Sequence, residues 1–211
     1  ISTVSSGMDG YKYRCVVSNT GCGSAASSSA TLTINEAPSV TAQTGNLEEC
    51  VSDNAAFEVT ASGAGLTYQW QENQGSGWNA LSNGGSYSGA SSSKLTISSV
   101  TKTFDGYAYR CVVSGTCNPS QTSVIDTLTV LSPPSITSQP SADEICENTN
   151  SSFSVSASGD ALTYQWQEDD GGGFSDLANG GKYSNVNTST LSISAVTSGM
   201  DGYDYRCVVD N

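Results

Sequence analysis

The stretch FDGYAYRCVV, residues 104–113, recurs almost unchanged as MDGYKYRCVV at residues 8–17 and as MDGYDYRCVV at residues 200–209. Successive side chains of a β-strand point to opposite faces of its sheet. Tyr109, Cys111 and Val113 therefore share one face, and Arg110 and Val112 share the other. We expect each copy to form one strand whose Tyr, Cys and second Val point into a hydrophobic core.

The three copies follow one another at a constant spacing of 96 residues. This period is too long for a solenoid repeat and suits a whole sandwich domain of about 100 residues. We expect the C-terminal part of a domain at 1–36, a complete domain at 37–132, and a domain lacking its last strand at 133–211. Short Pro-bearing joints between them predict a semi-rigid array. We expect the chain to be an excerpt from a longer one.

The charge balance is strongly acidic, with 20 acidic and 7 basic residues and a net charge of −13. Because phosphate binding needs clustered Lys and Arg, this balance argues against a nucleic-acid partner and an anionic membrane surface. The sequence contains no apolar run long enough for membrane insertion. Because residue 1 lies inside a repeat, we expect any signal peptide to lie upstream of this sequence. Seven cysteines in a chain rich in Ser and Thr indicate an oxidising, extracellular compartment.

Residues 37–132 contain seven or eight short alternating segments separated by turn signals, and no amphipathic helical pattern. The segment at 45–54 is polar and contains Cys50. This arrangement predicts an all-β, antiparallel sandwich.

Three motifs resemble those of an immunoglobulin-like domain of the I-set kind: YQW at 68–70, LTI at 95–97 and D-x-x-x-Y-x-C at 105–111. The resemblance implies tandem immunoglobulin-like sandwiches in a linear array. It also implies that Trp70 is the core tryptophan of strand C and that Tyr109 forms the tyrosine corner of strand F. The corresponding core residues of the other copies are Trp166, Tyr13 and Tyr205.

More narrowly, the chain is similar to the immunoglobulin-like repeats of very large secreted proteins of Bacteroidetes-type bacteria. The similarity rests on CE at 146–147, FSVSASG at 153–159, LTYQWQ at 162–167 and YRCVVSGTC at 109–117. It covers the whole chain. It implies a cell-surface or adhesin protein secreted by the type IX route, with roles in adhesion or gliding motility.

The cysteines depart from the usual immunoglobulin pattern. The strand B position that would face the strand F cysteine is Val59, and Val155 in the next repeat. Both valines are expected in the core. Other cysteines lie upstream of strand B or just past strand F, namely Cys50, Cys146, Cys22 and Cys117.

Three disulfide arrangements stay open. Cys50 with Cys117 is favoured by the family pattern, but an immunoglobulin fold would place these residues near opposite ends, and a bridge tolerates only about 7 Å between Cα atoms. Cys50 could instead join Cys111. Cysteines at domain ends could also join successive domains. We expect an intradomain bridge, which would stabilise the fold by roughly 4 kcal/mol. The remaining candidates are Cys146 with Cys207 or with a residue beyond this sequence, Cys15, and Cys22.

Residues that carry enzyme chemistry are scarce. The chain has no His, which removes the commonest general base and imidazole metal ligand. It also lacks Cys-x-x-Cys pairs and a phosphate-binding loop with Lys. We therefore expect neither an enzyme nor a cofactor.

Two acidic clusters invite a Ca²⁺ interpretation, because oxygen ligands at a domain end would stiffen a joint. We favour solvated loops instead, since the Asp-x-Asp-x-Asp spacing is missing. Asp9, Asp105 and Asp201 are expected to form turns before strand F. The acidic clusters comprise Glu48, Glu49 and Asp53, and Asp143, Glu144 and Glu147.

Residues expected on the surface are further candidates for glycan binding or glycosylation. Trp78 and its repeat counterpart Phe174 could stack on glycans, but packing of a hairpin on the sheet is the more ordinary interpretation. The recurring Arg110 is expected on the sheet surface. Short sequence matches mark possible glycosylation at Thr127, Asn150 and Asn187.

The sequence thus predicts a structural stalk or filament segment of a long extracellular bacterial surface protein, which presents a distal adhesive or other functional region. The alternatives are adhesin repeats that contact glycans or proteins through their loops, and an accessory module of a secreted enzyme. The expected partners are neighbouring immunoglobulin-like domains of the same chain, lateral copies through exposed sheet edges, or surface ligands.

Overall fold

The computed structural model describes residue 1 and residues 3–211, which divide into two compact units. The first comprises Ile1–Leu47, Asp53–Val100 and Gly106–Thr129, and the second comprises Glu48–Ser52, Thr101–Asp105 and Val130–Asn211. Helical structure in the described residues is limited to three single 3-10 turns: η1 (Ser6–Met8), η2 (Lys102–Phe104) and η3 (Ser198–Met200). The prediction of an all-β chain is confirmed. The domain boundaries at 36/37 and 132/133 stay predictions.

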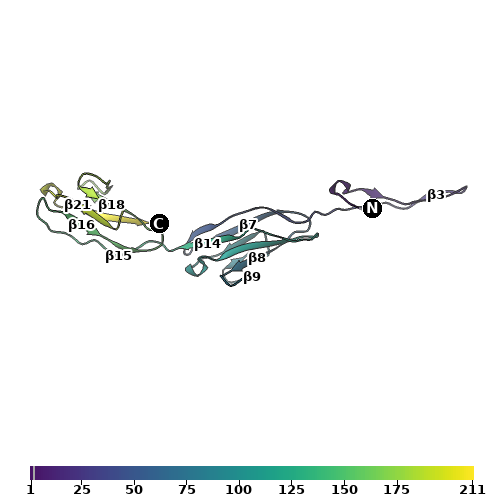
Figure 1. The fold of residues 1–211 in the computed structure, drawn as a ribbon, viewed down its shortest axis with the longest axis horizontal. Helices are drawn as coiled ribbons and strands as arrows, with labels where there is room; N and C mark the ends of the chain where they lie inside the picture. Colours follow the sequence, from purple (N-terminus) through teal and green to yellow (C-terminus); the bar gives the residue numbers. More distant parts are fainter. Residues whose placement is uncertain (2) are drawn as a thin grey trace. The chain divides into compact units, whose positions relative to one another are not determined.

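Two antiparallel sheets are built from residues 39–131 (Figure 1). The first has the strand order β10-β11-β7-β5, and the second has the order β6-β14-β12-β8-β9 with β13 beside β12. The strands of the first sheet are β5 (Ser39–Gln43), β7 (Ala55–Ser62), β10 (Tyr87–Ser88) and β11 (Lys94–Ile97). Those of the second are β6 (Leu47–Cys50), β8 (Thr67–Asn73), β9 (Trp78–Ala80), β12 (Ala108–Ser114), β13 (Gln121–Thr122) and β14 (Asp126–Leu131).

The repeated stretch forms the centre of the second sheet as β12. Cys111 lies opposite Trp70 of β8 in an unbroken antiparallel register. Tyr109, Cys111 and Val113 are fully buried, whereas Arg110 between them is partly exposed. The alternation of burial follows the predicted period of two. One strand was not expected: Leu47–Cys50, in the polar segment 45–54, pairs as β6 beside β14.

A layer of aromatic rings fills the space between these sheets. Trp70 is 1% exposed, and its indole N–H donates to the Ser92 carbonyl at 2.9 Å. The Phe57 ring stacks on Tyr109 at 4.9 Å between centroids and lies 6.4 Å from Trp70. Val59 is buried beside these rings on β7. Burial of these large apolar surfaces is the main force that holds the sheets together.

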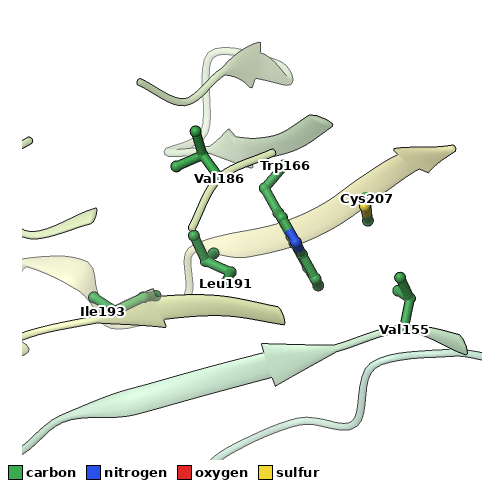
Figure 2. Packing of buried hydrophobic residues seen from close by; sticks show 6 residues of the cluster. All are labelled: Val155, Trp166, Val186, Leu191, Ile193 and Cys207. Carbon is green, nitrogen blue, oxygen red and sulfur yellow. The ribbon is translucent and has the colours of Figure 1, made fainter. Parts of the chain in front are cut away.

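The same core recurs in the second unit, with Trp166 at its centre (Figure 2). Its indole N–H donates to the Thr188 carbonyl at 2.9 Å, and Cys207 lies opposite it across the sheet. Val155 is 5% exposed. The strands are β15 (Ser135–Ser138), β16 (Ser151–Ser154), β17 (Ser156–Ser158), β18 (Thr163–Asp169), β19 (Ser175–Asp176), β20 (Tyr183–Ser184), β21 (Thr190–Ile193) and β22 (Asp204–Asp210). They pair in the orders β15-β17, β16-β21-β20 and β19-β18-β22.

The described residues of 1–36 form two short strand pairs. These are β1 (Lys12–Tyr13) with β4 (Ala30–Thr31), and β2 (Val16–Asn19) with β3 (Gly23–Ala26). Tyr13 was expected in a core but is 40% exposed. The reason is that, among the described residues, β1 to β4 pair only with one another, so the inward face of this copy of the repeated stretch is not covered by a second sheet.

Candidate functional site

The Pro-bearing linkers are packed against loops of the repeat that follows them. In the first unit, the Ala64 N–H donates to the Glu36 carbonyl at 3.2 Å, and the Thr116 N–H donates to the Ala64 carbonyl at 2.8 Å. Pro38 is buried. The linker backbone is therefore part of the folded structure and does not behave as a free tether.

A glycine makes this packing possible. Gly63 has φ of +134°, and a Cβ built there would lie 2.9 Å from Pro38 Cα and 3.0 Å from the Ala37 carbonyl oxygen. Only glycine provides both that backbone conformation and that close approach.

The arrangement repeats 96 residues later, in the second unit. The Asp160 N–H donates to the Ser132 carbonyl at 3.2 Å, and the Asp160 carboxylate accepts from the Ser132 N–H at 2.7 Å. Gly159 has φ of +141°, and its Cβ position lies 2.9 Å from the Pro133 carbonyl oxygen. Linker docking is thus a property of the repeat and not of one joint.

Asp160 also forms an ion pair with Lys102. The Lys102 ammonium lies 2.9 Å from Asp160 Oδ2 and 3.2 Å from Asp105 Oδ2, and it also donates to the Val130 carbonyl. These hydrogen bonds, first from Lys102 and then from Ser132, lower the pKa of Asp160 to about 2. The preceding repeat has Ala64 in the place of Asp160, so the charged arrangement distinguishes the two linkers.

The aspartate of the repeated stretch has a role that the sequence did not reveal. Asp105 follows η2 at a turn, as predicted, but its carboxylate also accepts the backbone N–H of Val130 in β14 at 2.9 Å. Asp9 accepts from Ile34 in the same way at 2.8 Å. The hydrogen bond from the Val130 N–H lowers the pKa of Asp105. The aspartate therefore anchors the last strand of its repeat, a long-range partner that local turn propensity does not predict.

An arginine stacks on an aromatic ring on the outer face of two sheets, the one that contains β8 and the one that contains β18. The Arg110 guanidinium carbon lies 4.0 Å above the Trp78 ring, and its Nε donates to Gln71 at 2.8 Å. Arg206 lies 3.9 Å above the Phe174 ring, which is 38% exposed. The expectation that the aromatic packs on its sheet is met by a cation–π contact, and this leaves a flat, partly exposed platform in each repeat.

A carboxylate among tyrosines lies between the sheets. Glu72 is 5% exposed and accepts from the Tyr87 hydroxyl and from Gln74, while the Tyr87 and Tyr109 hydroxyls lie 3.5 Å apart. Burial raises the pKa of Tyr87 and of Tyr109 far above the ordinary value for tyrosine. The expected tyrosine corner therefore takes a different form: Tyr109 is tied to side chains of β8 and β10.

The second unit has the same cluster. The Tyr205 hydroxyl donates to Glu168 Oε2 at 3.0 Å, and Tyr183 donates to the same oxygen. Burial raises the pKa of Tyr183 to about 12. Since these phenols stay protonated, they donate hydrogen bonds to the carboxylate, and the cluster crosslinks the two sheets.

The seven cysteines are free thiols in this structure, so no pair predicted within this sequence is formed. A bridge from Cys146 to a residue beyond this sequence stays a prediction. The register of the 37–132 repeat explains why Cys50 is bonded to neither Cys111 nor Cys117. Tyr109 lies opposite Asp126, near one end of β14, whereas the Val51 N–H next to Cys50 donates to Leu131 at the other end. Five residues of β-strand span roughly 17 Å, well beyond the reach of a disulfide. The cysteines differ in exposure. Cys111 and Cys207 are buried and Cys117 is partly exposed, whereas the other four are exposed: Cys15, Cys22, Cys50 and Cys146.

The remaining candidate residues are dispersed. Thr127 is part of β14, and its N–H donates to Asn46. Asn150 accepts from Ala195, and the Asn187 amide donates to Gln165 at 2.8 Å. Glycosylation at these sites stays a prediction. Among the described residues, no three His, Cys, Asp or Glu side chains gather closely enough to hold a metal ion. Within the same residues, no helix has the length and apolarity to cross a membrane.

Two packed antiparallel sheets with a buried tryptophan on β8 define an immunoglobulin-like β-sandwich, present here in tandem. A family model described as "Immunoglobulin domain" matches residues 133–211. A search of curated proteins found no match.

Solved structures of multi-domain proteins are similar in fold. An I-band fragment of titin is 19% identical with a TM-score of 0.58, and the match covers 95% of this chain and 69% of that one. Extracellular domains 3–5 of Drosophila OTK are 19% identical with a TM-score of 0.61, over 95% and 66% of the two chains. The eight N-terminal immunoglobulin domains of Down Syndrome Cell Adhesion Molecule are 21% identical with a TM-score of 0.64, over 100% and 27%. At these identities the likeness shows the fold alone.

Proposed function

We propose that this chain is a structural stalk or filament segment of a long extracellular bacterial surface protein, whose repeats hold a distal adhesive or other functional region away from the cell. The observation that carries the proposal is the docking of each linker on the loops of the following repeat. A linker that is part of the fold restricts bending, which is what a spacer needs and what a flexible ligand-searching tether would avoid.

Other observations support a spacer over an enzyme. The carboxylates of Glu72, which is buried, and Glu168, which is partly exposed, accept hydrogen bonds from tyrosine hydroxyls, and these bonds crosslink the sheets. The net charge of −13 favours solubility of an extended surface. By resemblance, we infer export through the type IX route and a role in adhesion or gliding motility. Its partners would then be neighbouring immunoglobulin-like domains of the same chain.

Small-angle scattering tests the stalk. We expect a rod-like particle whose maximum dimension changes little between low and high ionic strength. A matched variant with a Gly-Ser insertion between Ser132 and Pro133 serves as the flexible control. If the natural chain gives the same broad distribution of dimensions as the insertion variant, the stalk proposal is wrong.

A second candidate function rests on the stacked platform of Arg110 on Trp78, which recurs as Arg206 on Phe174. Aromatic faces at exposed positions can stack on sugar rings, so the repeats would act as glycan-binding adhesin modules. A glycan array compares the natural chain with Trp78→Ala. Binding that the substitution abolishes would favour this function. No binding by either protein would leave the stalk, or an accessory role beside a secreted enzyme.

A further inference from the structure

Arg110 is a cation without an anionic partner on the outer face of the sheet that contains β8 and β12. The chain has 20 acidic and 7 basic residues, yet ion pairs among the described residues are formed by Lys102 alone. Arg110 Nε donates to Gln71, but within the same residues the two terminal amino groups of the guanidinium have no acceptor. Because a guanidinium binds a carboxylate through paired N–H groups, these donors are suited to an anion.

The guanidinium is also held in one orientation. Its carbon lies 4.0 Å above the Trp78 ring, and the hydrogen bond from Nε to Gln71, at 2.8 Å, restricts its rotation above that ring. The supporting strands are in register: Arg110 of β12 lies opposite Gln71 of β8, which lies opposite Ala80 of β9. A donor group that is already ordered loses little conformational entropy when it binds a ligand.

The local charge around Arg110 favours an anion, although the chain as a whole is acidic. Glu72 of β8 points inward and is buried, and the other side chains that β8 and β12 turn outward are uncharged. At physiological ionic strength, exposed charges more than about 8 Å apart are largely screened. The neutral surface beside Arg110 therefore matters more than the net charge of −13. The uncharged outward-facing residues are Thr67, Gln69, Gln71, Asn73, Ala108, Val112 and Ser114.

The same stack recurs in the 133–211 repeat with acidic surroundings. Arg206 lies 3.9 Å above the Phe174 ring and donates through Nε to Gln167 at 2.7 Å. Two alanines beside the first stack are replaced by exposed aspartates beside the second. Because carboxylates repel an anionic ligand, the first stack is the better anion site. The replaced pairs are Ala80 and Asp176, and Ala108 and Asp204.

We propose that the Arg110 stack of the 37–132 repeat binds a polysaccharide that contains uronic acids. The carboxylate of one sugar accepts from the terminal amino groups of Arg110, and the apolar C–H face of that sugar contacts the partly exposed Trp78 ring. A uronate carries both groups on one rigid ring, whereas an acidic peptide offers its carboxylate on a flexible chain without a flat apolar face. The small side chains of Ala80 and Ala108 leave the approach open.

This inference rests on the second candidate function, glycan binding by the stacked platform, and it names the class of sugar that one of the two platforms selects. The difference between the platforms lies in the charge beside the arginine, because the arginine and the glutamine are identical in both repeats.

Isothermal titration calorimetry of the 211-residue chain with an oligosaccharide of galacturonic acid tests the proposal. We expect one binding site, which weakens at high ionic strength, and no binding of the methyl-esterified oligosaccharide. Arg110→Gln should raise the Kd at least about tenfold, because it removes a charge-assisted pair. Lys94→Gln is the matched control: it removes the same charge from an exposed position on β11, in the other sheet of this repeat, and should leave the Kd unchanged.

Exchange of the flanking charges provides a readout that does not depend on loss of the stack. Ala108→Asp keeps Arg110 and Trp78 and should raise the Kd about threefold. The combined substitution of Asp176→Ala and Asp204→Ala should add a second binding site in the 133–211 repeat, so that the stoichiometry rises from one to two. An unchanged stoichiometry would overturn the role of local charge in selecting the ligand.

The remaining outcomes separate this inference from glycan binding in general. Equal binding of the acidic oligosaccharide and its methyl ester would overturn carboxylate recognition and leave glycan binding in place. An oligoglutamate peptide that binds as tightly as the oligosaccharide would overturn the saccharide as the ligand. No binding of the acidic oligosaccharide, or binding that Arg110→Gln does not affect, would overturn the proposal, while the glycan array with Trp78→Ala would still decide whether the platform binds neutral sugars.

Discussion

Replacement of the two buried tryptophans tests how each sandwich is held together. Trp70 is 1% exposed and Trp166 is 0% exposed, and each indole N–H donates to a backbone carbonyl at 2.9 Å. An aromatic side chain of this kind buries about 150–250 Å². At about 25 cal/mol per Å² this burial stabilises the fold by roughly 4–6 kcal/mol.

Trp70→Ala should therefore lower the free energy of unfolding by about 3–5 kcal/mol, since alanine keeps part of the contact and the cavity relaxes only partly. That is a large fraction of the roughly 5–15 kcal/mol that stabilises a typical domain. Trp166→Ala should cost a similar amount, but its effect should fall on the unfolding of the second unit. The double variant should show both losses, because the residues have no shared partners.

Urea unfolding followed by far-UV circular dichroism measures both transitions. Trp78→Ala is the matched control, because Trp78 is a partly exposed tryptophan whose main contact is the Arg110 stack. Its loss should cost about 0.5–1 kcal/mol beyond its small burial. Equal losses for Trp70→Ala and Trp78→Ala, or a loss below about 1 kcal/mol for Trp70→Ala, would refute a core organised around the tryptophan.

Three further outcomes follow from the linkers and the thiols. Burial raises the pKa of Cys111 to about 11 and also raises that of Cys207. At pH 8 a disulfide reagent should therefore modify the other five thiols quickly and these two only after unfolding. Rapid modification of all seven thiols would contradict the burial of Cys111 and Cys207. The folded pKa of Asp160 is about 2, below the ordinary value of 3.8 for aspartate. The stabilising contribution of Asp160 should be present above about pH 4 and lost as the pH falls toward 2, and Asp160→Asn should remove that part of the acid dependence of the thermal midpoint. Gly63→Ala should destabilise the fold more than Gly84→Ala, as measured by the thermal midpoint, because both have φ near +135° but only the Cβ at 63 meets the linker; backbone strain alone costs about 1–3 kcal/mol, and equal losses would show that linker contact is unimportant.

Much of the fold follows from local pattern. The spacing of 96 residues and the alternation of β12 were enough to predict a sandwich repeat and to separate the buried face from the exposed one. Side-chain alternation in a strand depends only on backbone geometry, and it survives whatever the neighbouring strands are. The same reasoning failed at Leu47–Cys50, whose strand pairing depends on β14, a partner about eighty residues away.

The contacts that carry the proposed functions depend on long-range pairing and not on local sequence pattern. Nothing local to Asp105 indicates that it binds the Val130 N–H, and nothing local to Gly63 shows the linker above it. The cysteine pairings failed for the same reason, because sequence spacing gives no position along a neighbouring strand. Tyr13 has the same sequence context as Tyr109, yet it is 40% exposed, and among the described residues no second sheet faces it. The amino-acid pattern determines which side chains turn inward, while register and the presence of a facing sheet, set by long-range pairing, determine what they meet.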